Sequence, residues 1–509
     1  MEPVPPTHDW ARYEVALVVG LTAMVVLVSS WRLSSPSFWN DEAATWAVSG
    51  HGLSDLLQVL RDSGGDRGAA LYYGIVHVWI GWFGTSEIAL RSLSVLAAAG
   101  TIAPFHAVAR RLVSRSAAVV ATVLLAASPF FLAYARSARA YEMALAFVVL
   151  ASWAFLRAVE QPTRGRWVLF VGLAAVSVYL HWFAALVILA QFASLLPVAG
   201  DAVLWTRVRR SALALTLLVA PIAMWALFGS NSGIDWVARL NLAELRSVAS
   251  TFVGTNRLPL ELAVLCVFAV GLVTAVRAFE ATSRSATRTV PALELTWFPL
   301  PLLVTVAVSM VKPVLVSRYL IVALPGYVLL VGIGLVRLTR HRRKLLAAGL
   351  VLVVALTASG YRAIWFSDGG VENWRGVVAL IGRQAGPDDA IVIFPASAEF
   401  PFSYYARSDA ALAPRAGPLW PPVVWSAAFN RNTANSTALP AVERSPSPVL
   451  WLVIREPHGP TINSDAVGRS ELELLQQELD VRYGVHQPVS PFADDLSLMV
   501  VRYSIPISP

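Results

Sequence analysis

Long apolar segments dominate this sequence and restrict its fold more than any other feature. A helix needs about 20 mostly apolar residues to cross the hydrocarbon core of a bilayer, and about eleven segments meet that requirement. They lie near residues 14–31, 87–109, 117–133, 141–157, 167–184, 185–204, 211–229, 258–276, 293–311, 319–336 and 345–364. Only 14% of the residues are charged, against about 25% in soluble domains. The sequence excludes a soluble globular enzyme and predicts an α-helical polytopic membrane protein.

The positions of the basic residues predict how these helices are oriented. Arginine and lysine gather in alternate connections, at 110–115, 157–166, 207–210, 277–288 and 337–344. Because basic residues are retained on the cytoplasmic side, these loops are predicted to be cytoplasmic. The net charge of +8 then reflects topology, and no nucleic-acid partner is predicted. The loop 32–86 and all residues after 365 fall on the opposite side.

The chain after residue 365 has a different character. Short apolar segments at 390–394, 449–454 and 497–503 are typical of strands, and 470–479 of a helix, which together indicate a small α/β domain. We therefore predict a transmembrane domain at 1–365, with a first external loop at 32–86, and an extracytoplasmic α/β domain at 366–509.

Two adjacent carboxylates, Asp41 and Glu42, follow the first predicted span. Neighbouring helical residues point about 100° apart, so the two need not share one target. One carboxylate could act as a general base toward an acceptor hydroxyl. The alternative is structural: Asp41 caps a helix and Glu42 occupies its first turn.

A second group of polar residues lies at the predicted external end of the third and fourth spans. Arginine forks match phosphate oxygens, which at a membrane surface indicates a lipid-linked substrate. The alternative is an interfacial belt in contact with lipid headgroups. The residues of this group are Arg136, Arg139, Glu142, Tyr134 and Tyr141.

Further candidates are scattered along the chain. Lys312, Arg318 and Tyr319 precede a late span, with phosphate binding and headgroup anchoring as alternatives, and Arg91 is a cation within the second span. His181 ends the fifth span, where it is either a hydrogen-bonded interface residue or, with Asp41 and Glu42, part of a divalent metal site. Motifs for a nucleotide cofactor, such as a Gly-rich phosphate loop, are absent.

The order of these motifs resembles the GT-C glycosyltransferases, in particular protein O-mannosyltransferases and lipid A aminoarabinose transferases (glycosyltransferase family 39). The similar segments are Asp41-Glu42, a surface helix at 71–84 that contains Tyr72, Arg-Ser-Leu-Ser at 91–94, Tyr-Ala-Arg-Ser-Ala-Arg-Ala-Tyr at 134–141 and Ser-Arg-Tyr-Leu at 317–320. The resemblance is dense over 36–185 and returns at 311–330.

The resemblance implies a membrane glycosyltransferase in a bacterial plasma membrane. Its donor would be a polyprenyl-phosphate-linked sugar, mannose or a pentose, and its acceptor a hydroxyl of a glycan, lipid or protein. Asp41 is the implied general base of an inverting transfer. External cations would stabilise the departing phosphate. The alternatives are a transporter or lipid flippase without covalent chemistry and a non-catalytic scaffold, although the repeat symmetry usual in transporters is not visible.

Overall fold

The computed structural model divides the chain into two compact units. The first comprises Met1–Leu33, Ile88–Leu227 and Arg239–Trp365, and the second comprises Ser34–Glu87, Phe228–Ala238 and Phe366–Pro509. The structure describes residues 7–52, 69–197, 202–228, 237–282, 289–340, 342–357, 360–361, 372–395, 398–409, 412, 447–455, 466–489 and 498–505. Within these residues the first unit is helical, and the second combines helices with a sheet.

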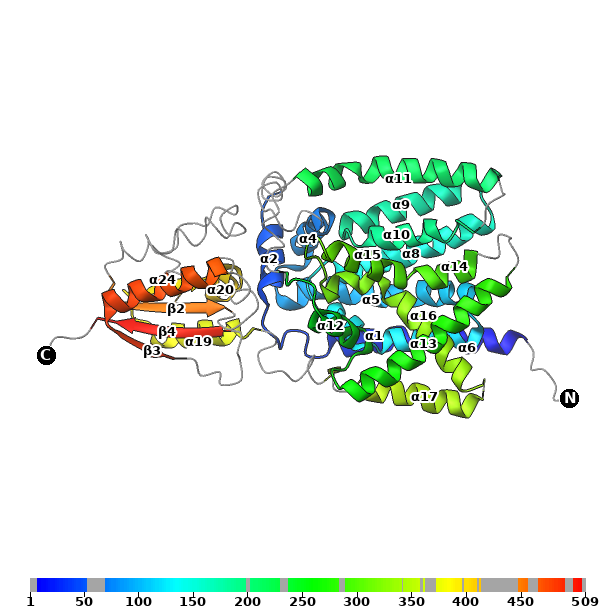
Figure 1. The fold of residues 1–509 in the computed structure, drawn as a ribbon. Coiled ribbons are helices and arrows are strands. Elements are labelled where there is room, and N and C mark those ends of the chain that lie inside the picture. Colours follow the sequence, from blue (N-terminus) through cyan, green and yellow to red (C-terminus); the bar gives the residue numbers. More distant parts are fainter. Residues whose placement is uncertain are drawn as a thin grey trace. The chain divides into compact units, whose positions relative to one another are not determined.

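The first unit is a bundle of helices (Figure 1). Its elements are α1 (Thr7–Ser30), α5 (Glu87–Leu112), α6 (Arg115–Ala126), α7 (Pro129–Ala135), α8 (Tyr141–Glu160), α9 (Arg164–Leu180), α10 (Ala184–Ala193), α11 (Ala202–Phe228), α12 (Leu242–Val253), α13 (Leu258–Ala281), α14 (Thr289–Thr296), α15 (Pro299–Ser309), the 3₁₀ helix η3 (Ser317–Ala323), α16 (Leu324–Leu338) and α17 (Arg343–Leu356).

Every predicted span overlaps one of these helices or two consecutive ones. Fewer than eleven of the described helices, however, are both long and apolar enough to cross a bilayer. In the described part of the chain, six are long and apolar enough to cross a membrane, or seven if the bent pair α6–α7 forms one span. Three helices on which predicted spans fall are shorter: α9, α10 and α17 have only 17, 10 and 14 residues. The structure therefore supports a multi-pass membrane protein, and the number eleven stays a prediction.

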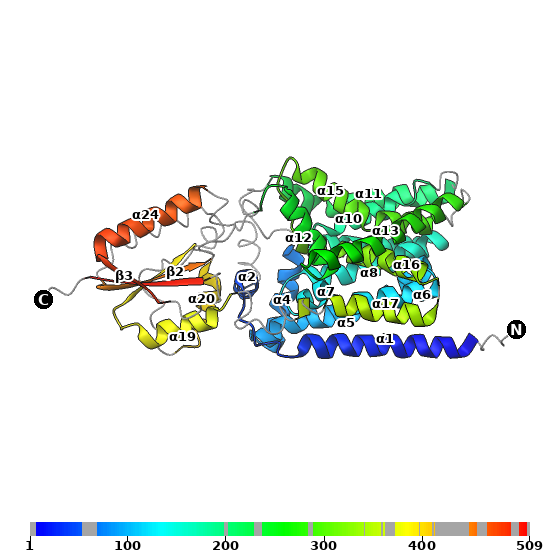
Figure 2. The ribbon, with the colours of Figure 1, turned by 60° about the horizontal axis from the view of Figure 1, so that its bottom comes forward.

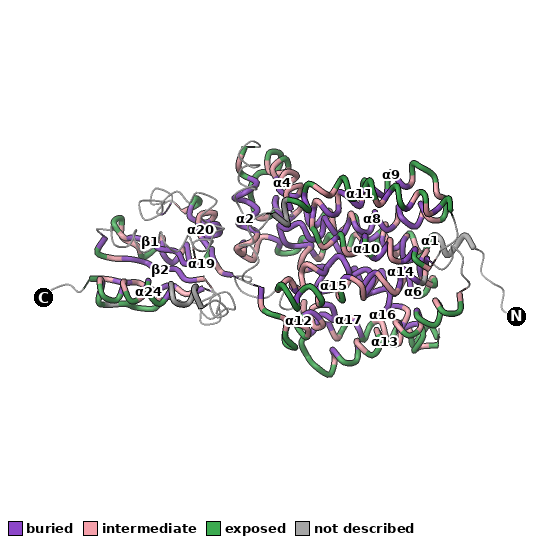
Figure 3. The backbone as a smooth tube through the Cα atoms, turned by 45° about the horizontal axis from the view of Figure 1, so that its top comes forward, coloured by how far each residue is buried: buried purple, intermediate pink, exposed green. Residues whose placement is uncertain are grey.

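Burial distinguishes inner helices from outer ones (Figure 3). The most apolar stretch of Ser317–Leu338 is 89% buried, whereas that of Leu258–Ala281 is 17% buried. The outer helices expose apolar side chains such as Val19 on α1 and Val273 on α13. Large exposed apolar surfaces are unfavourable in water, so these faces are suited to contact with lipid.

The inner helix α16 packs directly against α13 through glycines. A Cβ atom at Gly271 would lie 1.8 Å from the carbonyl oxygen of Leu330, and one at Gly334 would lie 2.0 Å from that of Val267. Glycines of this kind let two membrane helices approach closely. The contact holds α16, and with it the preceding η3, in a fixed place within the bundle.

A four-stranded sheet with the order β1-β2-β4-β3 forms the core of the second unit. β1 (Ala390–Phe394) runs parallel to β2 (Val449–Arg455), while β4 (Leu498–Ser504) is antiparallel to β2 and to β3 (Val485–Pro488). Helix α24 (Ala466–Tyr483) covers one face and α19 (Trp374–Gln384) the other (Figure 2). Alternate β2 residues, Leu450, Leu452 and Ile454, share a buried cluster with α24, as expected for the two-residue period of a strand.

Three strands and one helix of this unit lie where the sequence predicts them: β1, β2, β4 and α24. Three other elements are not predicted from the sequence: α19, α20 (Glu399–Ala406) and β3. β3 has the sequence Val-His-Gln-Pro, which is short, polar and ends in a proline, so it carries little of the usual strand signal.

The second unit also contains α2 (Asn40–Ser49) and α4 (Ala70–Phe83) from the predicted first external loop. α4 is the predicted surface helix at 71–84. α2 packs against both α4 and α20. The structure thus groups this loop with the C-terminal residues, whereas the sequence analysis assigned it to the membrane domain.

Candidate functional site

A break between α6 and α7 leads the chain into the turn that holds two of the predicted cations. The two helices are bent by 49° relative to each other. Ser128 Oγ accepts the backbone N–H of Phe131 at 3.4 Å, and Pro129 begins α7. A serine cap followed by proline is a favourable start for a new helix. The turn 136–140 then connects α7 to α8, and both Arg136 and Arg139 are buried there.

An aromatic cluster lies where α7, α8, α9 and η3 end or begin. It consists of Tyr134, Tyr141, His181, Phe183 and Tyr319. The Tyr141 ring centroid lies 5.0 Å from that of Tyr134 and 5.4 Å from that of His181. The Tyr319 centroid lies 5.3 Å from His181 and 5.2 Å from Phe183. The structure therefore brings together Tyr141, His181 and Tyr319, which the sequence analysis selected from three separate segments.

Arg139 and Arg318 both lie beside this cluster and share Tyr141 as a neighbour. Arg318 Nε donates to the Tyr141 hydroxyl oxygen at 3.1 Å, and its Cζ lies 5.5 Å from the Tyr319 ring centroid. Arg139 Cζ lies 5.9 Å from the Tyr141 centroid. Ring faces attract guanidinium groups and limit their orientations. Two oriented guanidinium groups are suited to bind phosphate oxygens.

His181 makes a hydrogen bond with the backbone of the cluster. Its Nδ1 accepts the backbone N–H of Phe183 at 3.3 Å. In the neutral ring, an accepting Nδ1 places the proton on Nε2. In that form His181 is a hydrogen-bond donor through Nε2.

Arg136 and Arg91 have a second role that the sequence did not reveal. Arg136 donates through NH1 to the carbonyl oxygens of Ser29 and Trp31, both at 2.6 Å, and through NH2 to that of Arg32 at 3.0 Å. Arg91 NH1 donates to the carbonyl oxygen of Leu33 at 2.8 Å. Carbonyls at the end of a helix lack intrahelical partners. The two arginines therefore hold the end of α1, and phosphate binding by them stays a prediction.

Two further candidates from the sequence, Lys312 and Tyr72, lie in different units. Lys312 is exposed just after α15 in the first unit. Tyr72 is buried in α4 of the second unit, where its ring makes an edge contact with Tyr73 at 5.9 Å. Neither contributes a ring or cation to the aromatic cluster as defined above, and their functional roles stay predictions.

The second unit carries the two predicted carboxylates on the first turn of α2. The N-cap residue is Trp39, so Asp41 does not cap this helix as the structural alternative proposed. Glu42 is 1% exposed, whereas Asp41 is only partly buried. Both are favourably placed beside the positive end of the helix dipole. Of the two carboxylates, Asp41 is therefore the one that is partly open to solvent.

Residues from the C-terminal part of the chain hold the segment that leads to α2. The backbone N–H of Phe38 donates to the Tyr405 hydroxyl oxygen at 2.7 Å, and that hydroxyl donates in turn to Glu87. Arg375 NH2 donates to the carbonyl oxygen of Ser34 at 2.9 Å and forms a 2.6 Å ion pair with Glu87. Burial and the Glu87 carboxylate raise the pKa of Tyr405, so this phenol stays protonated.

Glu399, the first residue of α20, should make the stability of the second unit depend on pH. Burial raises its pKa from 4.5 to about 8. The unfolded chain ionises from about pH 4.5 while the folded chain does not, so stability should fall as the pH rises toward 8. Glu399→Gln should remove most of this dependence of stability on pH. The full pKa shift would correspond to about 5 kcal/mol of unfolding free energy, and the incomplete burial of the side chain makes the actual contribution smaller. Thermal unfolding of both proteins from pH 5 to pH 9 checks this, and parallel curves would contradict it.

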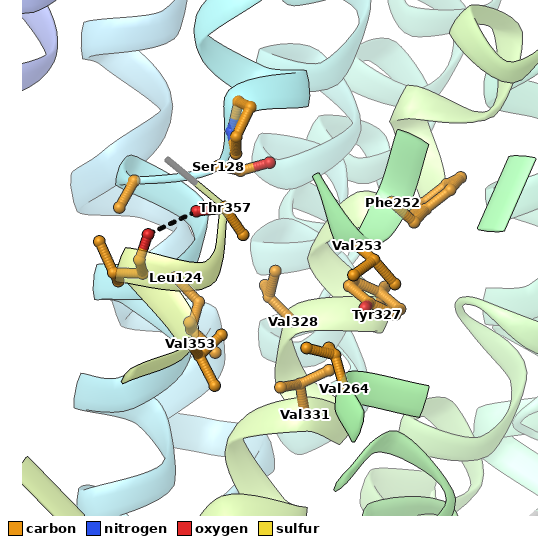
Figure 4. A pocket seen from close by; sticks show the side chains of 13 residues that line it. Leu124, Ser128, Phe252, Val253, Val264, Tyr327, Val328, Val331, Val353 and Thr357 are labelled. Carbon is orange, nitrogen blue, oxygen red and sulfur yellow. Dashed lines mark hydrogen bonds between the residues drawn. The ribbon is translucent and has the colours of Figure 1, made fainter. Parts of the chain in front are cut away.

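A cavity beside the α6–α7 break lacks, among the described residues that line it, the charged side chains that an active site for sugar transfer would need (Figure 4). Its walls are mostly apolar, and the sticks of Val328, Val331 and Val353 surround it. Thr357 Oγ1 is already used, since it donates to the carbonyl oxygen of Val354 at 2.8 Å. Of the residues that the structure describes, no Asp, Glu, His, Lys or Arg lines it, so it offers neither a carboxylate or imidazole base nor a cation for a phosphate.

Metal binding receives no support from the described residues. In that part of the chain, no three His, Cys, Asp or Glu side chains gather as a metal site would require. A divalent cofactor therefore stays a prediction.

Four further residues that surround the start of α2 are not predicted from the sequence: Glu87, Glu372, Arg375 and Tyr405. Their partners are far away in the chain: Tyr405 and Phe38 are separated by 367 positions. Pairs at such separations leave no periodic pattern in a single sequence. The only available signal was that Glu87 and Arg375 are charges outside the predicted cytoplasmic loops.

Residues 74–228 match the family model of dolichyl-phosphate-mannose-protein mannosyltransferases. This region includes α5 to α10 and therefore contains Arg91, Arg136, Arg139, Tyr141 and His181. A search of curated proteins gave no match.

Three solved membrane enzymes share the fold. ArnT from Cupriavidus metallidurans bound to undecaprenyl phosphate has 14% identity and a TM-score of 0.57, with 98% of each chain covered. The Archaeoglobus fulgidus oligosaccharyltransferase AglB, in complex with an inhibitory peptide and a dolichol-phosphate, has 12% identity and a TM-score of 0.51, covering 94% of this chain and 74% of AglB. Mycobacterial arabinofuranosyltransferase AftD has 13% identity and a TM-score of 0.51, covering 99% of this chain and 40% of AftD. The chain thus has the GT-C fold.

Proposed function

We propose that this protein, a glycosyltransferase of the GT-C fold and of the protein mannosyltransferase and ArnT type, transfers a sugar from a polyprenyl phosphate to an acceptor hydroxyl. The main support is the placement of Arg139 and Arg318 around Tyr141, in a fold whose ArnT example is bound to undecaprenyl phosphate. Guanidinium forks match phosphate oxygens in shape and charge. The sugar is mannose or a pentose, and the acceptor is a glycan, lipid or protein.

The proposed reaction is a single displacement with inversion at the anomeric carbon. Asp41 accepts the proton of the acceptor hydroxyl as its oxygen attacks that carbon. The bond between the anomeric carbon and the phosphate oxygen breaks, and polyprenyl phosphate leaves with the bonding electron pair. Arg139 and Arg318 stabilise the charge that develops on the departing phosphate. His181 Nε2–H and Lys312 are further donors for the same group.

Consumption of a lipid-linked sugar is the direct test. The purified full-length protein, in detergent or nanodiscs, is incubated with a panel of polyprenyl-phosphate sugars and an acceptor-containing membrane extract. Mass spectrometry should show one donor converted to free polyprenyl phosphate, with its sugar on an acceptor. If sealed vesicles show the intact donor changing leaflets without any bond cleavage, the protein is a flippase and the proposal is wrong.

The proposal places α24 and the sheet outside the cytoplasm of a plasma membrane, which cysteine labelling can check. Cys266 is the single cysteine of the chain and lies in α13. In a Cys266→Ser background, Glu473→Cys on the exposed side of α24 should react with a membrane-impermeant maleimide in intact cells. Arg164→Cys, in a predicted cytoplasmic loop, should react only after permeabilisation. The reverse pattern would overturn the orientation.

A further inference from the structure

Helix α2 lacks a cap of its own at the end that carries Asp41. Its N-cap residue is Trp39, and an indole has no acceptor for a backbone N–H. The first N–H groups of a helix lack the usual partner four residues back. In α2 the N–H of Glu42 bonds to the carbonyl oxygen of Trp39 at 3.0 Å, whereas earlier N–H groups need a partner from elsewhere. For the N–H of Asn40, the residue before Asp41, that partner is the Glu372 carboxylate, at 3.1 Å from Oε2.

Glu372 is itself held rigidly in the second unit. Its side chain is 1% exposed. Oε2 also accepts the indole N–H of Trp374 at 2.6 Å, and Oε1 accepts from Arg455 Nε at 2.9 Å. Arg455 ends β2 and Trp374 begins α19. A buried carboxylate that is paired and hydrogen-bonded on both oxygens is fixed in position. The cap of α2 is therefore anchored to the sheet and to α19.

We infer that Glu372 is a positioning residue for Asp41, which extends the role proposed above for that carboxylate. Glu372 binds the backbone one residue before Asp41 and places its negative charge at the positive end of the α2 dipole. It thereby fixes the direction in which the first turn of α2 presents Asp41. Displacement of a reacting group by about 1 Å can lower a rate about 100-fold.

Other contacts should keep α2 attached to the second unit when Glu372 is substituted. The substitution should therefore change the orientation of the first turn of α2. Tyr404 packs its ring against Trp46 at 5.2 Å, and the Arg407 guanidinium lies 4.7 Å from the Trp46 ring centroid. These contacts act on the last turns of α2, and Tyr405 holds Phe38 before the helix, whereas Glu372 acts on the first turn itself. Loss of Glu372 should therefore loosen the end that carries Asp41 while the helix remains in place.

The test compares Glu372→Gln with Tyr483→Phe in the full-length protein. Glutamine keeps the shape of the side chain but loses the charge and one of the two acceptor oxygens, so it cannot accept from Asn40, Trp374 and Arg455 together. Tyr483→Phe removes another buried hydrogen bond of this unit, to the carbonyl oxygen of Ser447 at 3.1 Å. Glu372→Gln should lower kcat about 10- to 100-fold with an unchanged donor KM. It should also speed hydrogen exchange at the start of α2. Tyr483→Phe should change neither quantity.

Each outcome decides the inference. An unchanged kcat, an unchanged exchange rate at the start of α2, or an equal effect of Tyr483→Phe would overturn it. Should Glu372→Gln fail to fold, Arg455→Lys tests the same anchor, because it keeps the charge but loses the guanidinium fork, and the same two readouts apply. If the unaltered protein consumes no lipid-linked sugar, the proposed function fails, while hydrogen exchange still reports on the cap.

Discussion

Replacing Asp41 with asparagine should leave the protein folded and lower sugar transfer about 10²- to 10⁴-fold, the range contributed by a general base. Asparagine has nearly the shape of aspartate but cannot accept the proton of an acceptor hydroxyl. Asp41 is partly exposed on the first turn of α2, so the exchange breaks no buried core. Single-turnover transfer from the donor identified in the panel measures the loss, and a thermal unfolding curve confirms that the fold is intact.

The neighbouring Glu42→Gln is the matched control for this substitution. It makes the same change from carboxylate to amide one residue later, at a side chain that is 1% exposed. We expect a smaller loss of transfer and a larger loss of stability, because a buried side chain contributes more to packing than to substrate contact. Full activity of Asp41→Asn would remove the general-base mechanism, and tolerance of Asp41→Ala would support a scaffold.

Local signals in the sequence were sufficient to locate many elements. The aromatic surface helix corresponds to α4, and three apolar segments correspond to β1, β2 and β4. Each of these depends on a run of neighbouring residues whose hydrophobicity is visible in the sequence itself. The turn at 134–141 was selected because arginine and tyrosine are close together there, and the structure adds His181 and Tyr319 to the same cluster.

Long-range contacts account for what the sequence did not predict. The grouping of α2 with the C-terminal unit depends on bonds such as Asn40 to Glu372, which are 332 positions apart. Arg136 was selected for its charge, and its bonds to three carbonyls at the end of α1 depend on how the chain turns there. Arg32, one of those three residues, has a positive φ of 53°, which is uncommon for a residue with a side chain.

Arg318→Met should raise the KM for the lipid-linked donor about 10- to 100-fold, because hydrogen bonds to charged groups contribute roughly 1.5–3 kcal/mol. Arg318 is oriented by the Tyr141 hydroxyl and by the Tyr319 ring. Arg318→Lys should recover only part of the affinity, since it keeps the charge but loses the planar fork. Tyr141→Phe, which removes the hydroxyl that accepts from Nε, should have an intermediate effect. Initial rates over a range of donor concentrations measure all three.

Arg337→Met is the control for Arg318→Met, because both arginines lie on the helical segment Ser317–Leu338, at opposite ends. Arg337 is exposed in the last turn of α16 and should leave the donor KM unchanged. If the two substitutions had equal effects on KM, or if neither had any, Arg318 would act only as an anchor to lipid headgroups. A selective effect of Arg318 would mean that the arginine held by Tyr141 and Tyr319 serves donor recognition, and that an arginine elsewhere on the same helical segment does not.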